Sequence, residues 1–336
     1  MECMKVAFFD TDPSEKDFFI EQLKEKAELL FFAEPISKVA VDKIKDCEIF
    51  SGFVFSKFPK EQIESLSNIK LIATQSTGYD HIDLDYCKSK NVTVCNVPEY
   101  GSSTVAEHTF ALILALTKRL MESNARVKSG SFDPEGLTGV DLKGKTLGVV
   151  GTGKIGINVI KIAKGFGMTV EAYDPYPKPE MEGFLGFKYV PLEKVLFESD
   201  IVTLHCPLSD STKHLINSKN IGLMKKGVYL INTARGGLIE TQALFEALRN
   251  GKVAGAGLDV LEEEDFLKEE RELLCKGSTQ KANLTTLAQN HILVNLSNVI
   301  VTPHNAFNSK EALQRILDTT ADNIASYLEG TPVNTV

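Results

Sequence analysis

The stretch VVGTGKIG, residues 149–156, constrains the fold more than any other part of the chain. An apolar strand candidate, TLGVV, leads into it, and an apolar helix candidate, IGINVIKIAKGFG, leads out of it. Gly151 permits a tight turn, Gly153 allows a ligand to approach the backbone, and Gly156 lets the helix pack closely on the strand. The start of such a helix offers free N–H groups and the positive end of the helix dipole. The stretch therefore predicts a strand–turn–helix that binds phosphate groups, against the alternative of an ordinary glycine-containing turn.

An acidic residue follows at the distance that a dinucleotide site requires. Asp174 closes the strand candidate TVEAYD, 18 residues after Gly156, where a carboxylate can hydrogen-bond to a ribose. Pro175 and Tyr176 come next, with no arginine to neutralise a 2′-phosphate. We therefore expect NAD rather than NADP, bound by the three glycines, by Asp174 and by the turn residues Lys154 and Ile155.

The glycine-rich turn lies in the middle of the chain, because a complete α/β domain comes before it. The first hundred residues contain the strand candidates KVAFFD, EIFSGFVF, KLIATQS and VTVCNV, with helix-like segments between them that carry proline near the first turn. Six more strand candidates follow from residue 146. This alternation predicts an α/β protein with two parallel-sheet domains, Rossmann-like and flavodoxin-like, and a cleft between them. We expect a substrate domain of residues 1–101 and 305–336 and an NAD-binding domain of residues 102–304, with the last helix, residues 309–330, returning to the first domain.

A long apolar helix is predicted over residues 103–123. Thr104 and Glu107 have the spacing of a capping box at its start. Its uninterrupted apolar run predicts burial between domains or between subunits.

Composition excludes several classes of partner. The 336 residues carry a net charge of −8, which argues against binding to nucleic acid or to an anionic membrane. Six scattered cysteines form no CxxC pair and accompany no histidine cluster, so we expect reduced thiols, a cytoplasmic location and no metal. The run FALILALT is too short to span a bilayer, and the first residues lack a signal-peptide pattern.

Three later strand candidates end in residues that could carry chemistry. Arg235 follows one strand in INTARGGLIE, carboxylates follow another in GLDVLEEED, and His304 follows a third in VIVTPHNAF. A cation, a carboxylate and an imidazole at one sheet edge can bind a carboxylate substrate and move a proton. Alternatively, Arg235 makes a surface or dimer salt bridge, and residues 262–265 begin a solvated helix. Spacing alone does not rank His205, which also follows a strand, below His304. The remaining histidines show no partner pattern and are interpreted as structural: His81, His108, His214 and His291.

Several of these motifs together resemble the D-isomer-specific 2-hydroxyacid dehydrogenase family. The matching stretches are GTGKIG with Asp174, HCPL, LINTARGGLIE, GAGLDV and TPHNAF, in this order over nearly the whole chain. HIDLDYC, TPHNAFNSKEAL and Tyr100 after VP resemble the D-lactate dehydrogenase branch in particular.

The resemblance assigns roles to individual residues. It implies that Arg235 holds the carboxylate and carbonyl of the substrate and that His304 is the general acid and base. In the family, a glutamate five residues after the aspartate of LDV pairs with that histidine, which here selects Glu264. This chain departs from the usual Glu-Pro at that point, because Asp265 follows. The loop QSTGYDHID resembles the family's carboxylate-binding loop, with backbone N–H groups around Thr77 and Gly78.

The resemblance also completes the list of predicted contacts. His205 moves to the cofactor side, together with Pro207, Thr233, Ala234 and Asp259. Tyr100 and Phe55 are expected at the C3 side of the substrate, where two aromatic rings leave room for little more than a methyl group. The expected protein is a homodimer, formed through its NAD-binding domain, that reduces pyruvate to D-lactate with NADH. The alternatives are a glyoxylate, hydroxypyruvate or broad-range 2-oxoacid reductase and, from another class, an NAD-sensing corepressor-like binding protein.

Overall fold

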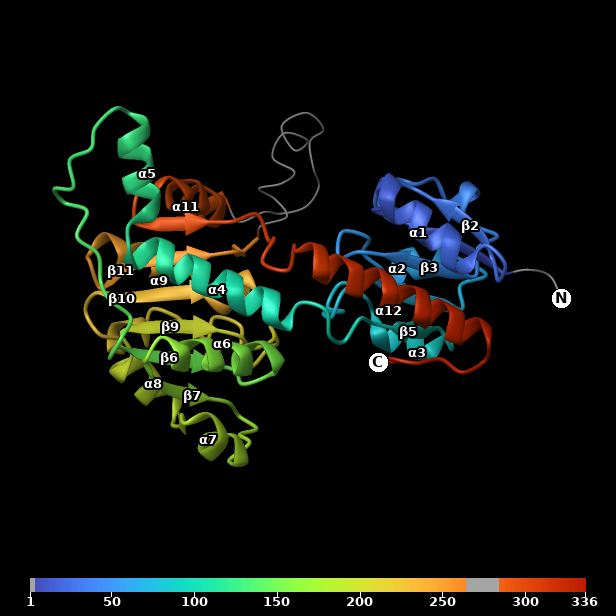
Figure 1. The fold of residues 1–336 in the computed structure, drawn as a ribbon. Coiled ribbons are helices and arrows are strands. Elements are labelled where there is room, and N and C mark those ends of the chain that lie inside the picture. The colour runs from blue at the N-terminus through green and yellow to red at the C-terminus, as the bar shows by residue number, and fades with distance from the viewer. Residues whose placement is uncertain (1–3, 264–283) are drawn as a thin grey trace. The chain divides into compact units, whose positions relative to one another are not determined.

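The computed structural model describes residues 4–263 and 284–336. The chain forms two compact units (Figure 1). Unit 1 runs to Tyr100 and takes up the chain again from Asn308, and unit 2 is Gly101–Phe307. Each unit contains one parallel sheet covered by helices on both faces. The predicted α/β class with two parallel sheets is therefore confirmed.

Unit 1 has a five-stranded sheet whose strand order is β2-β1-β3-β4-β5. Helices α1 (Pro13–Leu23) and α12 (Lys310–Leu328) cover one face, and the short helices α2 (Lys60–Glu64) and α3 (Leu84–Ser89) cover the other. Phe8 is buried and stacks on Phe19 and on Phe31 at ring-centroid distances of 4.4 and 5.0 Å. The strands are β1 (Lys5–Phe8), β2 (Glu28–Phe31), β3 (Ile49–Gly52), β4 (Leu71–Thr74) and β5 (Thr93–Cys95).

The end of the chain covers the edge strand β5. The backbone N–H of Val336 donates to Val94, and that of Asn96 donates to Asn334. Asn323 of α12, which is fully buried, donates to the carbonyl of Asn96 and accepts from the Asn334 side chain, each at 2.8 Å. Residues 334–336 thus satisfy backbone groups that an uncovered sheet edge would expose.

Unit 2 has a seven-stranded parallel sheet of order β12-β11-β10-β9-β6-β7-β8. Helices α4 (Ser102–Thr117) and α6 (Lys154–Gly165) pack on one face, and α8 (Leu192–Glu198), α9 (Thr241–Arg249) and α11 (Leu284–Asn295) on the other (Figure 1). One apolar core fills each face. The strands are β6 (Thr146–Val150), β7 (Thr169–Tyr173), β8 (Lys188–Tyr189), β9 (Ile201–Leu204), β10 (Val228–Asn232), β11 (Val253–Leu258) and β12 (Val299–Val301).

The structure corrects the prediction of one helix over residues 103–123. There are two helices, α4 and α5 (Leu120–Lys128), and the break falls at Arg119, whose φ of 51° is left-handed. The capping box of Thr104 and Glu107 is also wrong. Helix α4 already begins at Ser102, with Gly101 as its N-cap and no side-chain cap, so Thr104 lies inside the first turn.

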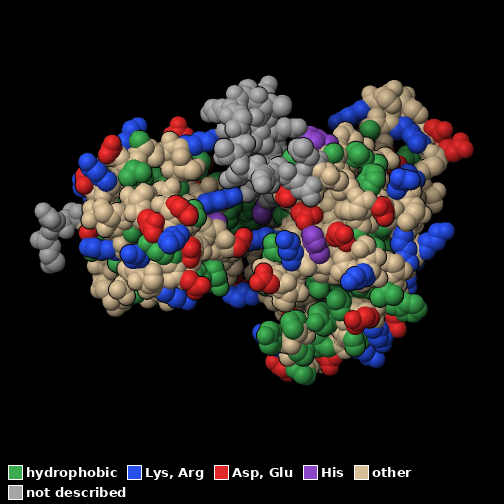
Figure 2. All heavy atoms as spheres, turned by 180° about the vertical axis from the view of Figure 1, so that it is seen from behind, with side chains coloured by type: hydrophobic (Ala, Val, Ile, Leu, Met, Phe, Trp, Pro, Cys, Tyr) green, Lys and Arg blue, Asp and Glu red, His purple; other side chains and the backbone are tan. Residues whose placement is uncertain are grey.

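The surface carries both signs of charge. Figure 2 shows Lys and Arg interspersed with Asp and Glu on the visible face, and an apolar patch on the lower part of unit 2. Exposed aromatic side chains in and around α7 (Glu180–Leu185) and α8 include Tyr176, Phe184 and Phe197. In the described ranges, no helix has the length and apolar character needed to cross a membrane.

Candidate functional site

The carboxyl ends of the unit 2 strands bring most of the predicted site residues to one sheet edge. Gly151 follows β6, Asp174 follows β7 and His205 follows β9. Adjacent ends are joined by backbone hydrogen bonds, from Gly151 to Tyr173 at 2.8 Å and from His205 to Val150 at 2.7 Å. Ligands of open α/β sheets bind at this edge.

The glycine-rich turn has the geometry that its sequence predicts. Gly151 adopts φ +96°, and a Cβ there would lie 2.7 Å from the His205 carbonyl group. A Cβ on Gly156 would overlap the carbonyl oxygen of Gly151. Gly153 is the N-cap of α6 and supplies no side-chain cap, and the space around it is open to 4 Å. The N–H groups at the start of α6, where Lys154 and Ile155 lie, are therefore accessible to an anion.

Asp174 is fixed beside this turn. Its Oδ2 accepts hydrogen bonds from the backbone N–H and the hydroxyl of Thr152, at 2.7 and 2.9 Å, and its Oδ1 accepts from the N–H of Tyr176 at 2.9 Å. An open helix terminus and a carboxylate at the end of the next strand are the two features that hold pyrophosphate and ribose in dinucleotide sites. The residues present thus fit NAD.

His205 contributes a neutral imidazole. Burial lowers its pKa to about 3. Its Nε2 lies 2.9 Å from the Thr203 hydroxyl, and its buried Nδ1 has no hydrogen-bond partner among residues 4–263 and 284–336. An unsatisfied buried ring nitrogen at the predicted cofactor edge is a second feature that fits a bound ligand.

Three further predicted cofactor contacts lie in the loops after β9 and β10. The Pro207 carbonyl accepts from the Thr212 hydroxyl at 2.7 Å. The Thr233 hydroxyl lies 3.1 Å from the hydroxyl of Thr109 in α4, and the Ala234 N–H donates to the Asn232 side chain at 3.0 Å. These bonds fix the loops at the sheet edge.

Arg235 lies just beyond β10, on a turn that its neighbours hold. The Asn232 amide donates to its carbonyl at 2.8 Å, and its own guanidinium Nη1 donates to the carbonyl of Ala234 at 2.9 Å. Arg235 as a whole is half-buried. The charged group is thus presented at the same sheet edge as His205.

His304 is presented by a turn after β12 that Asp259 anchors. His304 has a left-handed φ of 53°, and its N–H donates to the Asp259 carbonyl at 2.9 Å. The Asp259 side chain is 1% exposed and accepts from the N–H groups of Asn305 (3.0 Å) and Ala306 (2.8 Å) and from the Thr302 hydroxyl (2.5 Å). The geometry therefore gives Asp259, predicted as a cofactor contact, a clear role in holding the turn of His304.

The predicted partner of His304, Glu264, lies outside the described residues. Its neighbour Glu262 is engaged elsewhere: Oε1 lies 2.6 Å from Nε2 of His214, and Oε2 accepts from the Thr241 hydroxyl at 2.7 Å. Burial raises the pKa of Glu262, but these hydrogen bonds outweigh it and hold the pKa below its ordinary value. Glu262 is thus no part of a solvated helix start. Sequence reasoning missed the pair, because 48 residues separate its members.

The predicted substrate residues lie in unit 1. Thr77 and Gly78 follow β4 in a loop fixed by the bonds from Thr77 Oγ1 to Val97 (2.7 Å) and from Ser76 Oγ to Gly78 (2.6 Å). Phe55 follows β3 and is 51% exposed. The carbonyl of Tyr100 accepts from Nε of Arg315 at 2.7 Å.

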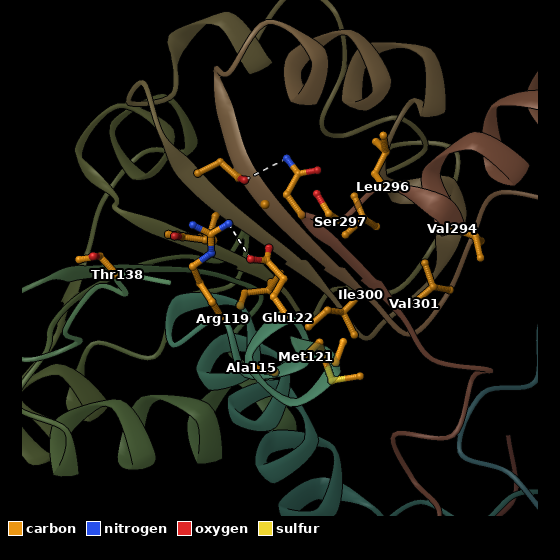
Figure 3. Close-up of a pocket in the computed structure, with 17 residues that line it drawn as sticks. Ala115, Arg119, Met121, Glu122, Thr138, Val294, Leu296, Ser297, Ile300 and Val301 are labelled. Atoms are coloured by element: carbon orange, nitrogen blue, oxygen red, sulfur yellow. Dashed lines mark hydrogen bonds and ion pairs between the residues drawn. The ribbon is translucent and has the colours of Figure 1, made fainter. Parts of the chain in front are cut away.

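A pocket of about 590 Å³ lies at the opposite, amino-terminal end of the unit 2 sheet (Figure 3). The starts of β10, β11 and β12 line it, together with α5 and the end of α11. Arg119 and Glu122 point toward one another in it and form an ion pair of 2.6 Å. None of the predicted catalytic or cofactor residues lines it. In the described part of the chain, no three His, Cys, Asp or Glu side chains are grouped as metal ligands.

A glycine turn before an open helix start, a carboxylate at the end of the next strand, and a sheet edge that carries Arg235 and His304 are the features of a nicotinamide-dependent dehydrogenase. The model of the D-isomer specific 2-hydroxyacid dehydrogenase NAD-binding domain matches residues 110–306. The chain belongs to this family. It is an NAD-dependent oxidoreductase that acts on the CH–OH group of 2-hydroxy acids, as the resemblance predicts, and NAD is its cofactor.

Individual relatives cover almost the whole chain. The D-lactate dehydrogenase of Escherichia coli is 37% identical over 334 residues, which are 97% of this chain and 98% of the relative. The glyoxylate reductase of Thermococcus litoralis is 37% identical over 303 residues, 88% and 85% of the two chains. The Aquifex aeolicus D-lactate dehydrogenase, solved with NAD and lactic acid, is 39% identical with a TM-score of 0.89 and coverage of 97% and 96%.

Proposed function

We propose that this enzyme is a D-lactate dehydrogenase that reduces pyruvate to D-lactate with NADH. The observation that carries the proposal is the placement of Arg235 and His304 at the carboxyl edge of the sheet that also presents the NAD turn. The similarity to two D-lactate dehydrogenases over nearly the full length supports it.

Each residue has a defined task in the proposed reaction. Arg235 binds the carboxylate of the oxo acid and polarises its carbonyl group. His304, as imidazolium, protonates the carbonyl oxygen at C2, and Glu264 stabilises the charged imidazole. The N–H groups around Thr77 and Gly78 hold the substrate carboxylate. NADH supplies the hydride when bound.

Selection for a small substrate is proposed to come from unit 1. Phe55 and Tyr100 would lie at the C3 side of the oxo acid, and one methylene in such a pocket is worth about 1–3 kcal/mol. In this proposal, residues 1–101 and 305–336 form the substrate domain and residues 102–304 the NAD-binding domain.

Reduction of glyoxylate or hydroxypyruvate is the second candidate, because a relative at 37% identity is a glyoxylate reductase. A panel of NADH-oxidation assays separates the two. It compares pyruvate, 2-oxobutyrate, phenylpyruvate, 4-methyl-2-oxopentanoate, glyoxylate and hydroxypyruvate. We expect the highest kcat/KM with pyruvate and D-lactate as the product. A preference for glyoxylate or hydroxypyruvate would support the second candidate, and a preference for phenylpyruvate would refute the small pocket.

The preference for NADH is proposed to depend on Asp174. Asp174→Ala removes a carboxylate that would repel the 2′-phosphate of NADPH, so the ratio of kcat/KM for NADH and NADPH should fall. Asp210→Ala, on the exposed loop after β9, is the control. An unchanged ratio in the Asp174 variant would contradict the assignment.

We further propose a homodimer formed through unit 2. The helix α5 and the loop that follows it expose several apolar side chains, of which Met121 also lines the pocket of Figure 3: Leu120, Met121, Val127, Phe132 and Val140. Phe132 is 82% exposed, and several exposed apolar side chains in one segment favour burial against a partner. Sedimentation analysis should show a dimer for the wild type and a monomer for Met121→Glu with Phe132→Glu. An unchanged mass in the double variant would exclude this face, whereas Phe184→Glu should have no effect.

A further inference from the structure

Glu262 contacts residues from three separate segments at the carboxyl edge of unit 2. Oε1 lies 2.6 Å from His214, in the loop after β9. Oε2 accepts from the backbone N–H (3.3 Å) and the hydroxyl (2.7 Å) of Thr241, in the segment after β10. The carbonyl of Glu262 accepts from the amide of Asn290 in α11 at 2.8 Å. Glu262, in the loop after β11, thus connects the loop after β9, the start of α9 and helix α11.

The bond to Thr241 is a helix cap supplied from another loop. Thr241 is the first residue of α9, and the N-cap residue Glu240 makes no side-chain cap. The Glu262 carboxylate takes over this task, and its charge complements the positive end of the helix dipole. The position of the start of α9 therefore depends on a residue that is not part of that helix.

The segment between Arg235 and Thr241 is held on both sides, by the residue before Glu262 and by the partner of Glu262. The N–H of His214 donates to the carbonyl of Gly237 at 2.8 Å. Gly236 packs so closely on the backbone of Leu261 that a Cβ there would overlap it. The turn that presents Arg235 is thus enclosed between the residue before Glu262 and the histidine that pairs with Glu262.

We propose that Glu262, paired with His214 and capping Thr241, is a positioning residue that acts through Arg235 to set the affinity for the oxo acid. The proposal rests on the proposed role of Arg235 as the residue that binds the substrate carboxylate. Both carboxylate oxygens of Glu262 are occupied by these donors, which assigns it to positioning rather than to pairing with His304. An error of about 1 Å in a binding group can cost roughly 100-fold in rate.

The test compares substrate affinity with cofactor affinity. In Glu262→Gln, we expect KM for pyruvate to rise roughly 10-fold or more, with a smaller change in kcat and with the Kd for NADH, from fluorescence titration, unchanged within about twofold. His214→Ala should have the same effect, and the double variant should be no worse than either single one, because the two residues act as a pair. Thr241→Val should raise KM for pyruvate, whereas Thr241→Ser, which keeps the hydroxyl, should have the KM of the wild type.

The control is Glu240→Gln at the same helix start, since its carboxylate accepts from the backbone N–H of Ser218 and does not cap the helix. It should leave KM unchanged. The proposal is overturned if KM stays constant in the Glu262 and Thr241→Val variants, if the Kd for NADH rises in parallel, or if the control behaves alike. Circular dichroism identifies a variant that fails to fold. If Glu262→Gln fails to fold, the comparison of Thr241→Val with Thr241→Ser decides whether the proposal holds. A wild type that reduces no acid of the panel overturns the proposed function as well, whereas an active wild type with unaffected variants overturns only the positioning role.

Discussion

The first strand–helix units of the two sheets differ in one respect that decides which of them can hold a nucleotide. In unit 1, Asp12 caps α1: its Oδ1 accepts from the N–H groups of Ser14 and Glu15, at 2.8 and 3.1 Å, and the Glu15 carboxylate accepts from the N–H of Asp12. In unit 2, Gly153 leaves the start of α6 without a side-chain cap. A helix terminus that already holds a carboxylate has no free site for a phosphate.

The residues that follow β1 and β6 also differ in whether a side chain fills the turn. Asp10 and Gly151 both adopt a left-handed φ, of 58° and 96°. Asp10 fills its position with a carboxylate that accepts from the Ser56 hydroxyl at 2.7 Å, and burial raises its pKa. Gly151 leaves its position empty of side chain. Two parallel sheets thus differ in the side chains at equivalent turns, which leave only the turn of unit 2 open to a ligand.

The largest expected effect tests whether the chemistry belongs to the unit 2 edge. His304→Gln should lower kcat by about 10²–10⁴ through loss of the proton donor, while the Kd for NADH stays nearly unchanged. His291→Gln, on the exposed side of α11, is the matched control and should be fully active. A His304 variant with near-normal kcat would place proton transfer elsewhere.

The second prediction converts the unit 2 turn into the unit 1 type. Gly153→Asp is sterically allowed, because the space around Gly153 is open and its φ is −67°. The new carboxylate should cap α6, keep Tm or raise it, and weaken NADH binding roughly 10- to 100-fold by repulsion of the phosphates. Gly153→Asn caps the helix without the charge and should lose less affinity. Equal affinity in all three proteins would refute the assignment of the phosphate site.

The third prediction concerns selection by unit 1. Phe55→Ala should shift relative kcat/KM from pyruvate toward phenylpyruvate by about 1–3 kcal/mol, because the proposed substrate pocket gains room at C3. The Kd for NADH should be unaltered. Phe18→Ala, on α1, serves as the control for a lost aromatic ring in the same unit. If both variants keep the wild-type preference, the size filter lies elsewhere.

The smallest effect concerns the capped helix itself. Asp12→Ala should lower the free energy of unfolding by about 0.5–2 kcal/mol at pH 7 and leave NADH binding unchanged. The hydrogen bonds from Ser14 and Glu15 lower the pKa of Asp12, so this stabilisation is present above its unfolded-state pKa and is lost as pH falls through the folded-state value. Urea unfolding at pH 7 and pH 3 should therefore show a smaller difference between variant and wild type at the lower pH. A difference that does not depend on pH would argue against the cap.

The strands and the glycine turn were predictable because each is a local pattern. Buried runs such as TLGVV alternate with amphipathic helices, and Asp174 follows at a regular distance. Strand β2, with the sequence ELLF, was missed because it is a partly exposed edge strand without a continuous buried run. The break at Arg119 was missed because its left-handed backbone has no glycine to signal it.

Contacts between distant segments were beyond reach of the same reasoning. The spacing of His214 and Glu262 carries no signal until the strand order places their loops together. Likewise, Asp259 could be assigned to the NAD edge by resemblance, but only the folded turn shows its carboxylate holding the backbone beside His304.

The three residues that cover β5, 334–336, have a consequence for the protein's colloidal stability. Without residues 334–336, the backbone groups of Val94 and Asn96 would lose their partners, and an unprotected strand edge is a template for pairing with other molecules. A chain shortened by these residues should keep its activity when freshly prepared but form light-scattering aggregates sooner on storage at high concentration. The tendency of the enzyme to aggregate would then depend on residues that take no part in its reaction.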